Sequence, residues 1–251
     1  MTAWRVLVIG IGSGVPGHLT ADAVEAMGSV EVFLAADKRA ETSDLVRMRS
    51  DLCRAVLDRG RYRFVALPDP ERRRGSYLED VACWHRRRAA VQATAISDEL
   101  PDGGTVGFLV WGDPSLYDST LRQLELIRAA GLELDVRVVP GLSSPSLLAA
   151  AHGIALNRVG RPVHITTGRR LLAEYDPALG DVVVMLDGGL ACAELTGAYP
   201  ELVIFWGAQL GLADQVVIAG RLADVIEQIR RARDRLRTQR GWVMDTYLLR
   251  A

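Results

Sequence analysis

Two loops of this 251-residue chain combine Gly, Pro, Ser and Asp in a way that suits the binding of a small molecule through the backbone. Residues 110–118 (VWGDPSLYD) and 140–146 (PGLSSPS) each follow a short, β-branched apolar run that ends in turn residues, which is typical of a buried strand. In open α/β sheets, ligands bind outside the carboxyl ends of strands, where loops expose N–H and C=O groups. Either loop alone could be an ordinary strand-to-helix turn, but the pair predicts one ligand site.

A third loop, residues 10–20, follows the first apolar run and contains a literal G-x-G-x-x-G pattern from Gly12 to Gly17, with Asp37 following 20 residues later. This spacing is typical of dinucleotide-binding proteins, in which a helix N-terminus beginning within the glycines meets the pyrophosphate. Here Pro16, Gly17 and His18 intervene, and the amphipathic pattern begins only afterwards. We therefore do not expect this loop to bind an NAD-type cofactor.

Strand-like and helix-like patterns alternate up to residue 140, which predicts a mostly parallel sheet with helical crossovers. Beyond that point fewer helices separate the apolar runs, which indicates a second domain with a mixed sheet. We predict an α/β protein with domains at residues 1–140 and 141–251. The expected strands lie near 4–10, 30–36, 61–67, 105–111, 134–139, 163–166, 181–187, 201–206, 216–220 and 242–249, and the expected helices near 19–28, 42–58, 76–100, 118–130, 145–152 and 222–238.

The three loops, in this order, resemble those of the tetrapyrrole methyltransferase family, whose members methylate ring carbons with S-adenosylmethionine. The resemblance covers nearly the whole chain and implies the tetrapyrrole methylase fold, with an active-site cleft between two α/β domains. The segments 36–38, 84–88 and 185–188 are most similar to members that methylate a precorrin and release acetate from it. Trp111 departs from the family pattern, in which Gly is usual before Gly-Asp-Pro.

The resemblance assigns the methyl donor to residues of the paired loops and of three later segments, with S-adenosylhomocysteine as the product. The implied donor-binding residues are Trp111, Gly112, Asp113, Leu116, Ser143, Ser144, Met185, Leu210 and Trp242. Met185 and Leu116 could instead be core residues, and Ser143 could be a helix N-cap. The implied substrate-binding residues are Gly12, Gly14, His18 and Lys38.

Loss of an acetyl group as acetate requires a base for water and donors for an oxyanion. We expect the catalytic groups among Asp113, Tyr117 and Asp37, which lie at the predicted loops. The chain has no G-x-S-x-G pattern, so an acyl-enzyme formed on such a serine is not expected.

The charge and residue content of the chain limit the classes of molecule that it is expected to bind. Between residues 59 and 90 there are nine arginines and four acidic residues, an excess of five positive charges that suits a polycarboxylate such as a precorrin. A net charge of −1 and the lack of interleaved aromatic and basic residues argue against nucleic acid. We expect no membrane span, no metal and a cytoplasmic location, because the apolar runs are short and the three cysteines are widely spaced.

Two other functions fit the same residues. The protein could methylate a different carbon of the corrinoid or sirohaem pathway, or it could be a non-catalytic module that binds S-adenosylmethionine. Homodimers are common in the family, so a homodimer is also expected.

Overall fold

The computed structural model describes residues 4–37, 43–58, 60–70 and 77–251. They fold as two compact units, Met1–Leu142 and Ser143–Ala251. The predicted α/β class is confirmed, with a parallel sheet in unit 1 and a mixed sheet in unit 2. The division falls two residues after the boundary that the change in sequence pattern predicts.

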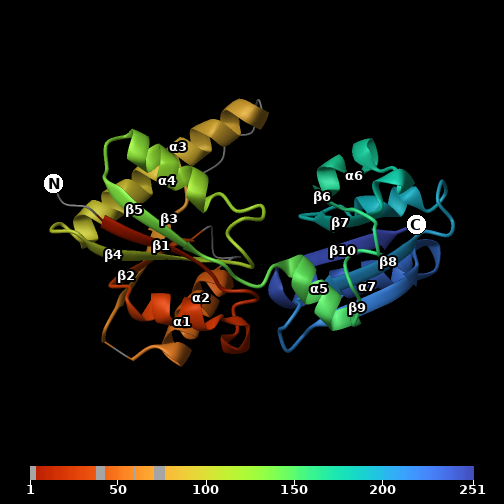
Figure 1. Ribbon diagram of the computed structural model, residues 1–251, viewed down its shortest axis with the longest axis horizontal. Coiled ribbons are helices and arrows are strands. Elements are labelled where there is room, and N and C mark those ends of the chain that lie inside the picture. The colour runs from red at the N-terminus through yellow and green to blue at the C-terminus, as the bar shows by residue number, and fades with distance from the viewer. Residues whose placement is uncertain (1–3, 38–42, 59, 71–76) are drawn as a thin grey trace. The chain divides into compact units, whose positions relative to one another are not determined.

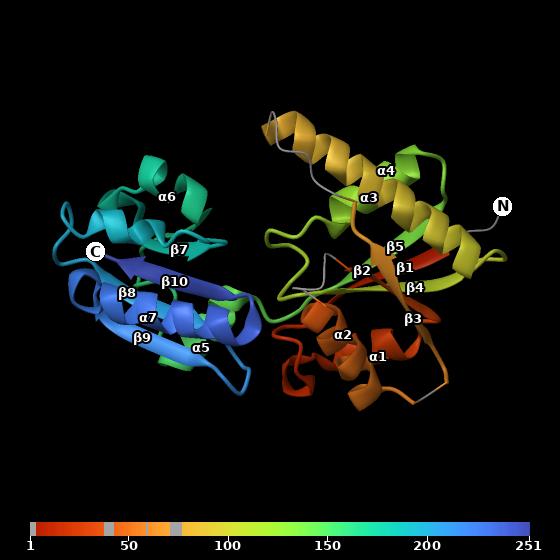
Figure 2. The same ribbon diagram turned by 180° about the vertical axis from the view of Figure 1, so that it is seen from behind.

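Unit 1 is built around a five-stranded parallel sheet in the order β3-β2-β4-β1-β5. Helices α1 and α2 cover one face of this sheet, and α3 and α4 cover the other (Figure 1 and Figure 2). The strands are β1 (Trp4–Gly10), β2 (Val32–Asp37), β3 (Arg63–Pro68), β4 (Gly104–Val110) and β5 (Leu134–Val139), and the helices are η1 (Pro16–His18), α1 (Ala21–Gly28), α2 (Ser43–Val56), α3 (Tyr77–Glu99) and α4 (Thr120–Ala129).

The central strands of unit 1 are buried on both faces, as expected for a parallel sheet covered by helices. In β1, the side chains of residues 6–9 are fully buried, and they contribute alternately to the apolar clusters on the two faces. This packing fixes the carboxyl ends of β1, β4 and β5 at the same end of the parallel sheet, and the three Gly-rich loops begin there.

Unit 2 contains a five-stranded mixed sheet in the order β6-β7-β10-β8-β9. Only β6 and β7 are parallel, and the other neighbouring pairs are antiparallel. The strands are β6 (Val163–Thr167), β7 (Asp181–Met185), β8 (Val203–Ala208), β9 (Val216–Arg221) and β10 (Asp245–Arg250), and the helices are α5 (Ser144–His152), α6 (Gly168–Glu174), η3 (Pro177–Leu179), η4 (Ala191–Leu195) and α7 (Leu222–Arg240).

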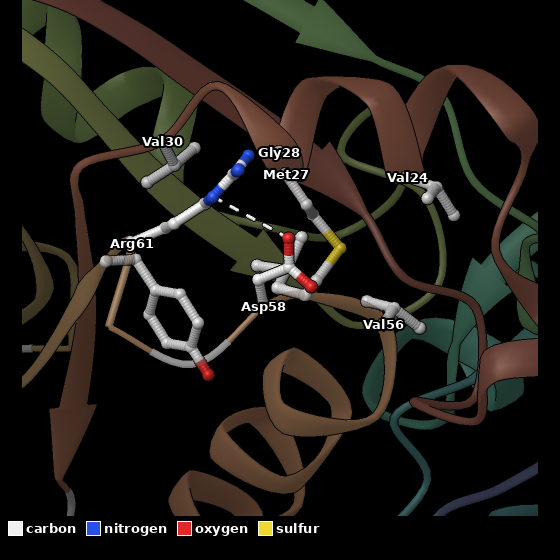
Figure 3. Close-up of a pocket in the computed structure, with 9 residues that line it drawn as sticks. Val24, Met27, Gly28, Val30, Val56, Asp58 and Arg61 are labelled. Atoms are coloured by element: carbon white, nitrogen blue, oxygen red, sulfur yellow. Dashed lines mark ion pairs between the residues drawn. The ribbon is translucent and has the colours of Figure 1, made fainter.

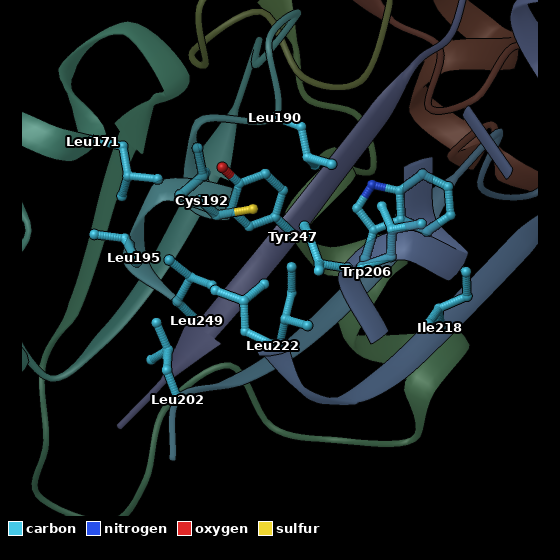
Figure 4. Packing of buried hydrophobic residues seen from close by; sticks show 14 of the residues in the cluster. Leu171, Leu190, Cys192, Leu195, Leu202, Trp206, Ile218, Leu222, Tyr247 and Leu249 are labelled. Atoms are coloured by element: carbon cyan, nitrogen blue, oxygen red, sulfur yellow. The ribbon is translucent and has the colours of Figure 1, made fainter. Parts of the chain in front are cut away.

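The larger core of unit 2 lies on one face of this sheet, where Trp206 and Tyr247 are almost fully buried among aliphatic side chains (Figure 4). Helix α5 packs on the other face through Leu148, beside Val183 and Leu248. The sequence pattern does not predict the short helix α6, which begins directly after β6. Among the described residues, no helix has the length and apolar character that crossing a membrane requires.

Candidate functional site

The three Gly-rich loops of unit 1 meet through their backbones at the carboxyl ends of β1, β4 and β5. The N–H of Gly112 donates to the carbonyl of Gly12 (2.8 Å), and the N–H of Gly12 donates to the carbonyl of Gly112 (3.2 Å). A Cβ atom added to Gly141 would lie 2.3 Å from the carbonyl oxygen of Gly112 and 2.7 Å from the carbonyl carbon of Gly10. Glycine is therefore required at this contact, because any side chain would separate the loops.

The Asp113 carboxylate joins the two predicted donor loops. Its Oδ1 accepts hydrogen bonds from the N–H (2.8 Å) and the hydroxyl of Ser115, and its Oδ2 accepts one from the N–H of Gly141 (2.9 Å). Partial burial opposes ionisation, but these hydrogen bonds outweigh it and lower the pKa of Asp113 below its ordinary value of 3.8. The geometry favours a positioning role for this residue over that of a general base.

We predict that the stabilising effect of this carboxylate depends on pH. Because its pKa is lower in the folded than in the unfolded protein, the stabilisation is complete above 3.8 and is lost as the pH falls through the folded value. Thermal unfolding of the unmodified protein and of Asp113→Asn should differ by a constant amount between pH 6 and 8, and the difference should shrink below about pH 4. A difference that grows towards acid would contradict this assignment.

The Trp111 indole connects the loop after β4 to the loop after β1 and to α2. A Cβ atom added to Gly14 would lie 2.3 Å from Cζ3 of Trp111, so the indole packs directly on that glycine. The guanidinium of Arg49 lies over the indole ring, with its Cζ atom 4.8 Å from the ring centroid. This arrangement gives a physical reason for a bulky residue where the family usually has Gly.

The other predicted substrate residues of the first loop are close to one another. His18 ends η1, and its Nδ1 lies 2.7 Å from the Ser13 hydroxyl. A Cβ atom added to Gly12 would lie 2.8 Å from the His18 Cβ, so these two residues are packed together. Asp37 is the last residue of β2, at the same edge of the sheet, and Lys38 lies outside the described residues.

Leu116 and Tyr117 complete the turn after Asp113. The N–H of Leu116 donates to the carbonyl of Asp113 (3.2 Å), and the Leu116 side chain is half-buried. Tyr117 has a φ of +51°, in the left-handed region, and its side chain is 44% exposed. The left-handed backbone at Tyr117 carries a conformational cost of the kind often found at functional residues.

In unit 2, the predicted donor-binding residues Met185, Leu210 and Trp242 lie near one end of the mixed sheet, where β7 and β8 end and β10 begins. Met185 ends β7 and pairs with Thr246, while Leu210 follows the end of β8. The side chain of Leu210 is only 7% exposed and packs in an apolar cluster with Leu148. The Trp242 Nε1 is buried and has no hydrogen-bond acceptor among the described residues.

Ser143 and Ser144 begin helix α5. The Ser143 hydroxyl accepts a hydrogen bond from the N–H of Ser146 (3.3 Å), which makes Ser143 the N-cap of this helix. Ser144 is the first helical residue. Both serines therefore lie at the positive end of the helix dipole, where an anionic group is stabilised.

Gln209 is a functional candidate that no sequence motif indicates. It is only 1% exposed, its φ is +51°, and neither polar atom of its amide has a hydrogen-bond partner among the described residues. A buried amide without partners is costly, so in a native structure it calls for an explanation such as strain, a catalytic role, or a bound water or ion. It lies between Ala208 and Leu210, at the same sheet edge as Met185.

A buried network of hydrogen bonds and one ion pair holds the loop after β7 in place. The Asp187 carboxylate accepts hydrogen bonds from the Tyr247 hydroxyl (2.5 Å) and the N–H of Ala191 (2.7 Å), and Arg233 donates to the carbonyl of Asp187 (2.7 Å). Arg233 also forms an ion pair with Asp245 (3.0 Å). The network supports the backbone that follows Met185.

A separate hollow of about 250 Å³ lies in unit 1 (Figure 3). Its walls come from α1, the end of α2 and the segment before β3, which includes Tyr62. Asp58 and Arg61 form an ion pair (3.6 Å) at this hollow, and both side chains are largely exposed. The hollow includes Gly28, the last residue of α1, and contains none of the predicted site residues. We therefore do not assign it to the donor or substrate site.

A protein-family model described as Tetrapyrrole (Corrin/Porphyrin) Methylases matches residues 5–226. The chain belongs to this family. It is also 43% identical over 249 residues to a precorrin-6A synthase [deacetylating] from Sinorhizobium sp, a match covering 98% of this chain and 95% of that protein. The resemblance seen in the three loops is thus confirmed.

Solved structures agree with this membership. A cobalamin synthesis related protein (CobF) from Corynebacterium diphtheriae has a TM-score of 0.84 and 38% identity, with 100% of this chain and 99% of that chain covered. A uroporphyrin-III C-methyl transferase from Thermus thermophilus, complexed with S-adenosyl homocysteine, has a TM-score of 0.62 and 18% identity, with 98% and 91% covered. The latter shows the shared fold alone. Like the other tetrapyrrole methylases, this protein is an S-adenosylmethionine-dependent methyltransferase, as the sequence predicts.

Proposed function

We propose that this tetrapyrrole methylase converts precorrin-5 to precorrin-6A by methylating C-1 and releasing acetate. The observation that carries this proposal is the identity of 43% to a deacetylating precorrin-6A synthase over nearly the full length of both chains. The high structural similarity to CobF supports it, since the name given to that protein relates it to cobalamin synthesis.

The described residues fit S-adenosylmethionine on both units. In unit 1, the left-handed backbone of Gly112 (φ +68°) allows a ligand to approach closely. In unit 2, the buried Gln209 amide and Trp242 N–H have no partners among the described residues, and adenine and ribose supply donors and acceptors for such groups. We assign the donor to the residues named from the sequence: Trp111, Gly112, Asp113, Leu116, Ser143, Ser144, Met185, Leu210 and Trp242.

When bound, S-adenosylmethionine supplies an electrophilic methyl group on its sulfonium. The protein contributes mainly by positioning, because an in-line displacement needs the donor and the carbon nucleophile near contact distance, and such positioning supplies roughly 7–11 kcal/mol. Asp113 fixes the two loops relative to each other through Ser115 and Gly141. The N-terminus of α5, at Ser143 and Ser144, suits the donor's carboxylate.

Gly12, Gly14, His18 and Lys38 are assigned to the precorrin. With the Asp113 carboxylate committed to three hydrogen bonds, Tyr117 and Asp37 are the stronger candidates for activating water in the release of acetate. We also propose a homodimer in the cytoplasm; the free cysteines Cys53, Cys83 and Cys192 suit a reducing compartment.

Incubation with methyl-labelled S-adenosylmethionine and precorrin-5 tests the proposal. We expect labelled precorrin-6A and one equivalent of free acetate per methyl transferred, measured by mass spectrometry and an acetate assay. Methylation without acetate would indicate a methyltransferase acting at another carbon. Binding of the donor without any transfer would indicate a non-catalytic module.

A further inference from the structure

Among the described residues, the Arg49 guanidinium donates its hydrogen bonds only to uncharged backbone carbonyls. This half-buried residue of α2 donates from Nε to the carbonyl of Leu109 (2.9 Å) and from Nη1 to the carbonyl of Leu45 (3.2 Å). Among the described residues, no carboxylate forms an ion pair with it, and its Nη2 has no hydrogen-bond acceptor. Two carbonyls thus fix the guanidinium while one of its terminal nitrogens stays available.

The neighbouring charges leave this cation only partly compensated. Burial lowers the pKa of Arg49 to about 10, Asp118 acts in the opposite direction, and Arg88 adds to the lowering. Arg88 has its own partner, Asp69, at 3.0 Å, and the Asp118 carboxylate accepts a hydrogen bond from the N–H of Thr120 (2.7 Å). An additional anion beside Arg49 would therefore be stabilised, and Arg49 is protonated at neutral pH.

The Trp111 ring sets the orientation of this guanidinium. The ring lies 4.8 Å below the guanidinium carbon and itself packs on Gly14 of the first loop. Leu109 and Trp111 flank the last residue of β4, so the cation lies at the carboxyl edge of the sheet, where the site loops begin. A planar guanidinium fixed in this way presents its free N–H groups in the fork geometry that suits a carboxylate.

We propose that Arg49, oriented by Trp111, binds a carboxylate side chain of the tetrapyrrole substrate. The inference rests on the proposed function, because a precorrin carries acetate and propionate groups. It assigns Arg49 to substrate binding and Trp111 to the positioning of Arg49. It also accounts for the departure of Trp111 from the family pattern, since Gly at this position would leave the guanidinium without its stacking partner.

The test compares Arg49→Met, Arg49→Lys and the control Arg47→Met. Arg47 lies on the same helix, but its side chain is 69% exposed and pairs with Asp44, so its removal changes the net charge equally without touching the site. We expect the KM for precorrin-5 to rise about tenfold or more in Arg49→Met, equivalent to about 1.4 kcal/mol. Arg49→Lys should be intermediate, since a Lys ammonium lacks the planar fork. The Kd for S-adenosylmethionine and the kcat should change less than twofold, and the control should match the unmodified protein.

An unchanged KM in a folded Arg49→Met protein overturns the inference. Should that variant not fold, as judged by circular dichroism, Arg49→Lys carries the test, and it should raise KM without altering donor affinity. Fluorescence titration with uroporphyrin III, a tetrapyrrole polycarboxylate, separates this inference from the proposed reaction. A higher Kd for uroporphyrin III in Arg49→Met than in the unmodified protein supports the inference, even without turnover of precorrin-5. An equal Kd in the two proteins, or no binding by either of them, overturns it.

Discussion

Replacing Gly141 by Ala is expected to destabilise unit 1 by about 3 kcal/mol and to abolish binding of the methyl donor. The added Cβ would lie 2.3 Å from the carbonyl oxygen of Gly112 and 2.8 Å from the Cα of Gly10. These are backbone atoms at the ends of paired strands, so they cannot move aside as a flexible side chain would. The loops after β1, β4 and β5 must separate, and Asp113 then loses the N–H of Gly141.

Urea unfolding and calorimetric titration with S-adenosylmethionine measure the two effects. Gly17→Ala is the matched control, because no atom lies within 4 Å of a Cβ added there and its φ is not positive. We expect this control to change stability by less than about 0.5 kcal/mol and to bind the donor normally. Normal donor affinity in Gly141→Ala would show that the close contact of these loops does not form the donor site.

Replacing Arg233 by Met is expected to destabilise unit 2 by about 3–5 kcal/mol. The Arg233 and Asp245 side chains are only 8% and 6% exposed, so the change leaves a buried carboxylate without its cation. Burial already raises the pKa of Asp245 even though Arg233 and the N–H of Trp206 oppose it. Without Arg233 the pKa should rise further, and the variant should lose more stability as the pH rises, because the unfolded state releases its proton first.

Differential scanning calorimetry between pH 5 and 8 measures this loss. The control, Arg230→Met, removes a cation from the same helix, but its pair with Glu227 is exposed and should contribute less than about 0.5 kcal/mol. The double variant Arg233→Met/Asp245→Leu should recover much of the loss, since no buried charge then lacks a partner. A double variant as unstable as the single one would mean that the hydrogen bonds from Arg233 to the carbonyls of Asp187 and Gly188 dominate instead.

The sequence predicts the sheet classes well, because β-branched runs and turn residues identify all ten strands of the described residues. The expected strands end near residues 111 and 139, and β4 and β5 end at Val110 and Val139. The sequence pattern does not indicate helix α6, because its seven residues are too few to show a helical period.

Contacts between distant residues are harder to predict than the elements that carry them. The carboxylate of Asp113 bonds to the N–H of Gly141 across 28 residues, and composition around either position does not indicate the other. No sequence pattern indicates Gln209, because a single amide after a strand forms no motif, and only its burial without partners among the described residues makes it notable. Arg49 lies outside residues 59–90, the Arg-rich segment whose composition predicts carboxylate binding.

Each unit is one continuous stretch of chain, and the change from one to the other falls within the 140–146 loop. During synthesis, every strand of the parallel sheet is therefore translated before any strand of the second sheet. Domains generally fold as units, the N-terminal one first. We expect unit 1 to fold during translation, before helix α5, which begins at Ser144, packs into unit 2. Nascent chains should therefore gain affinity for the methyl donor only after unit 2 has folded.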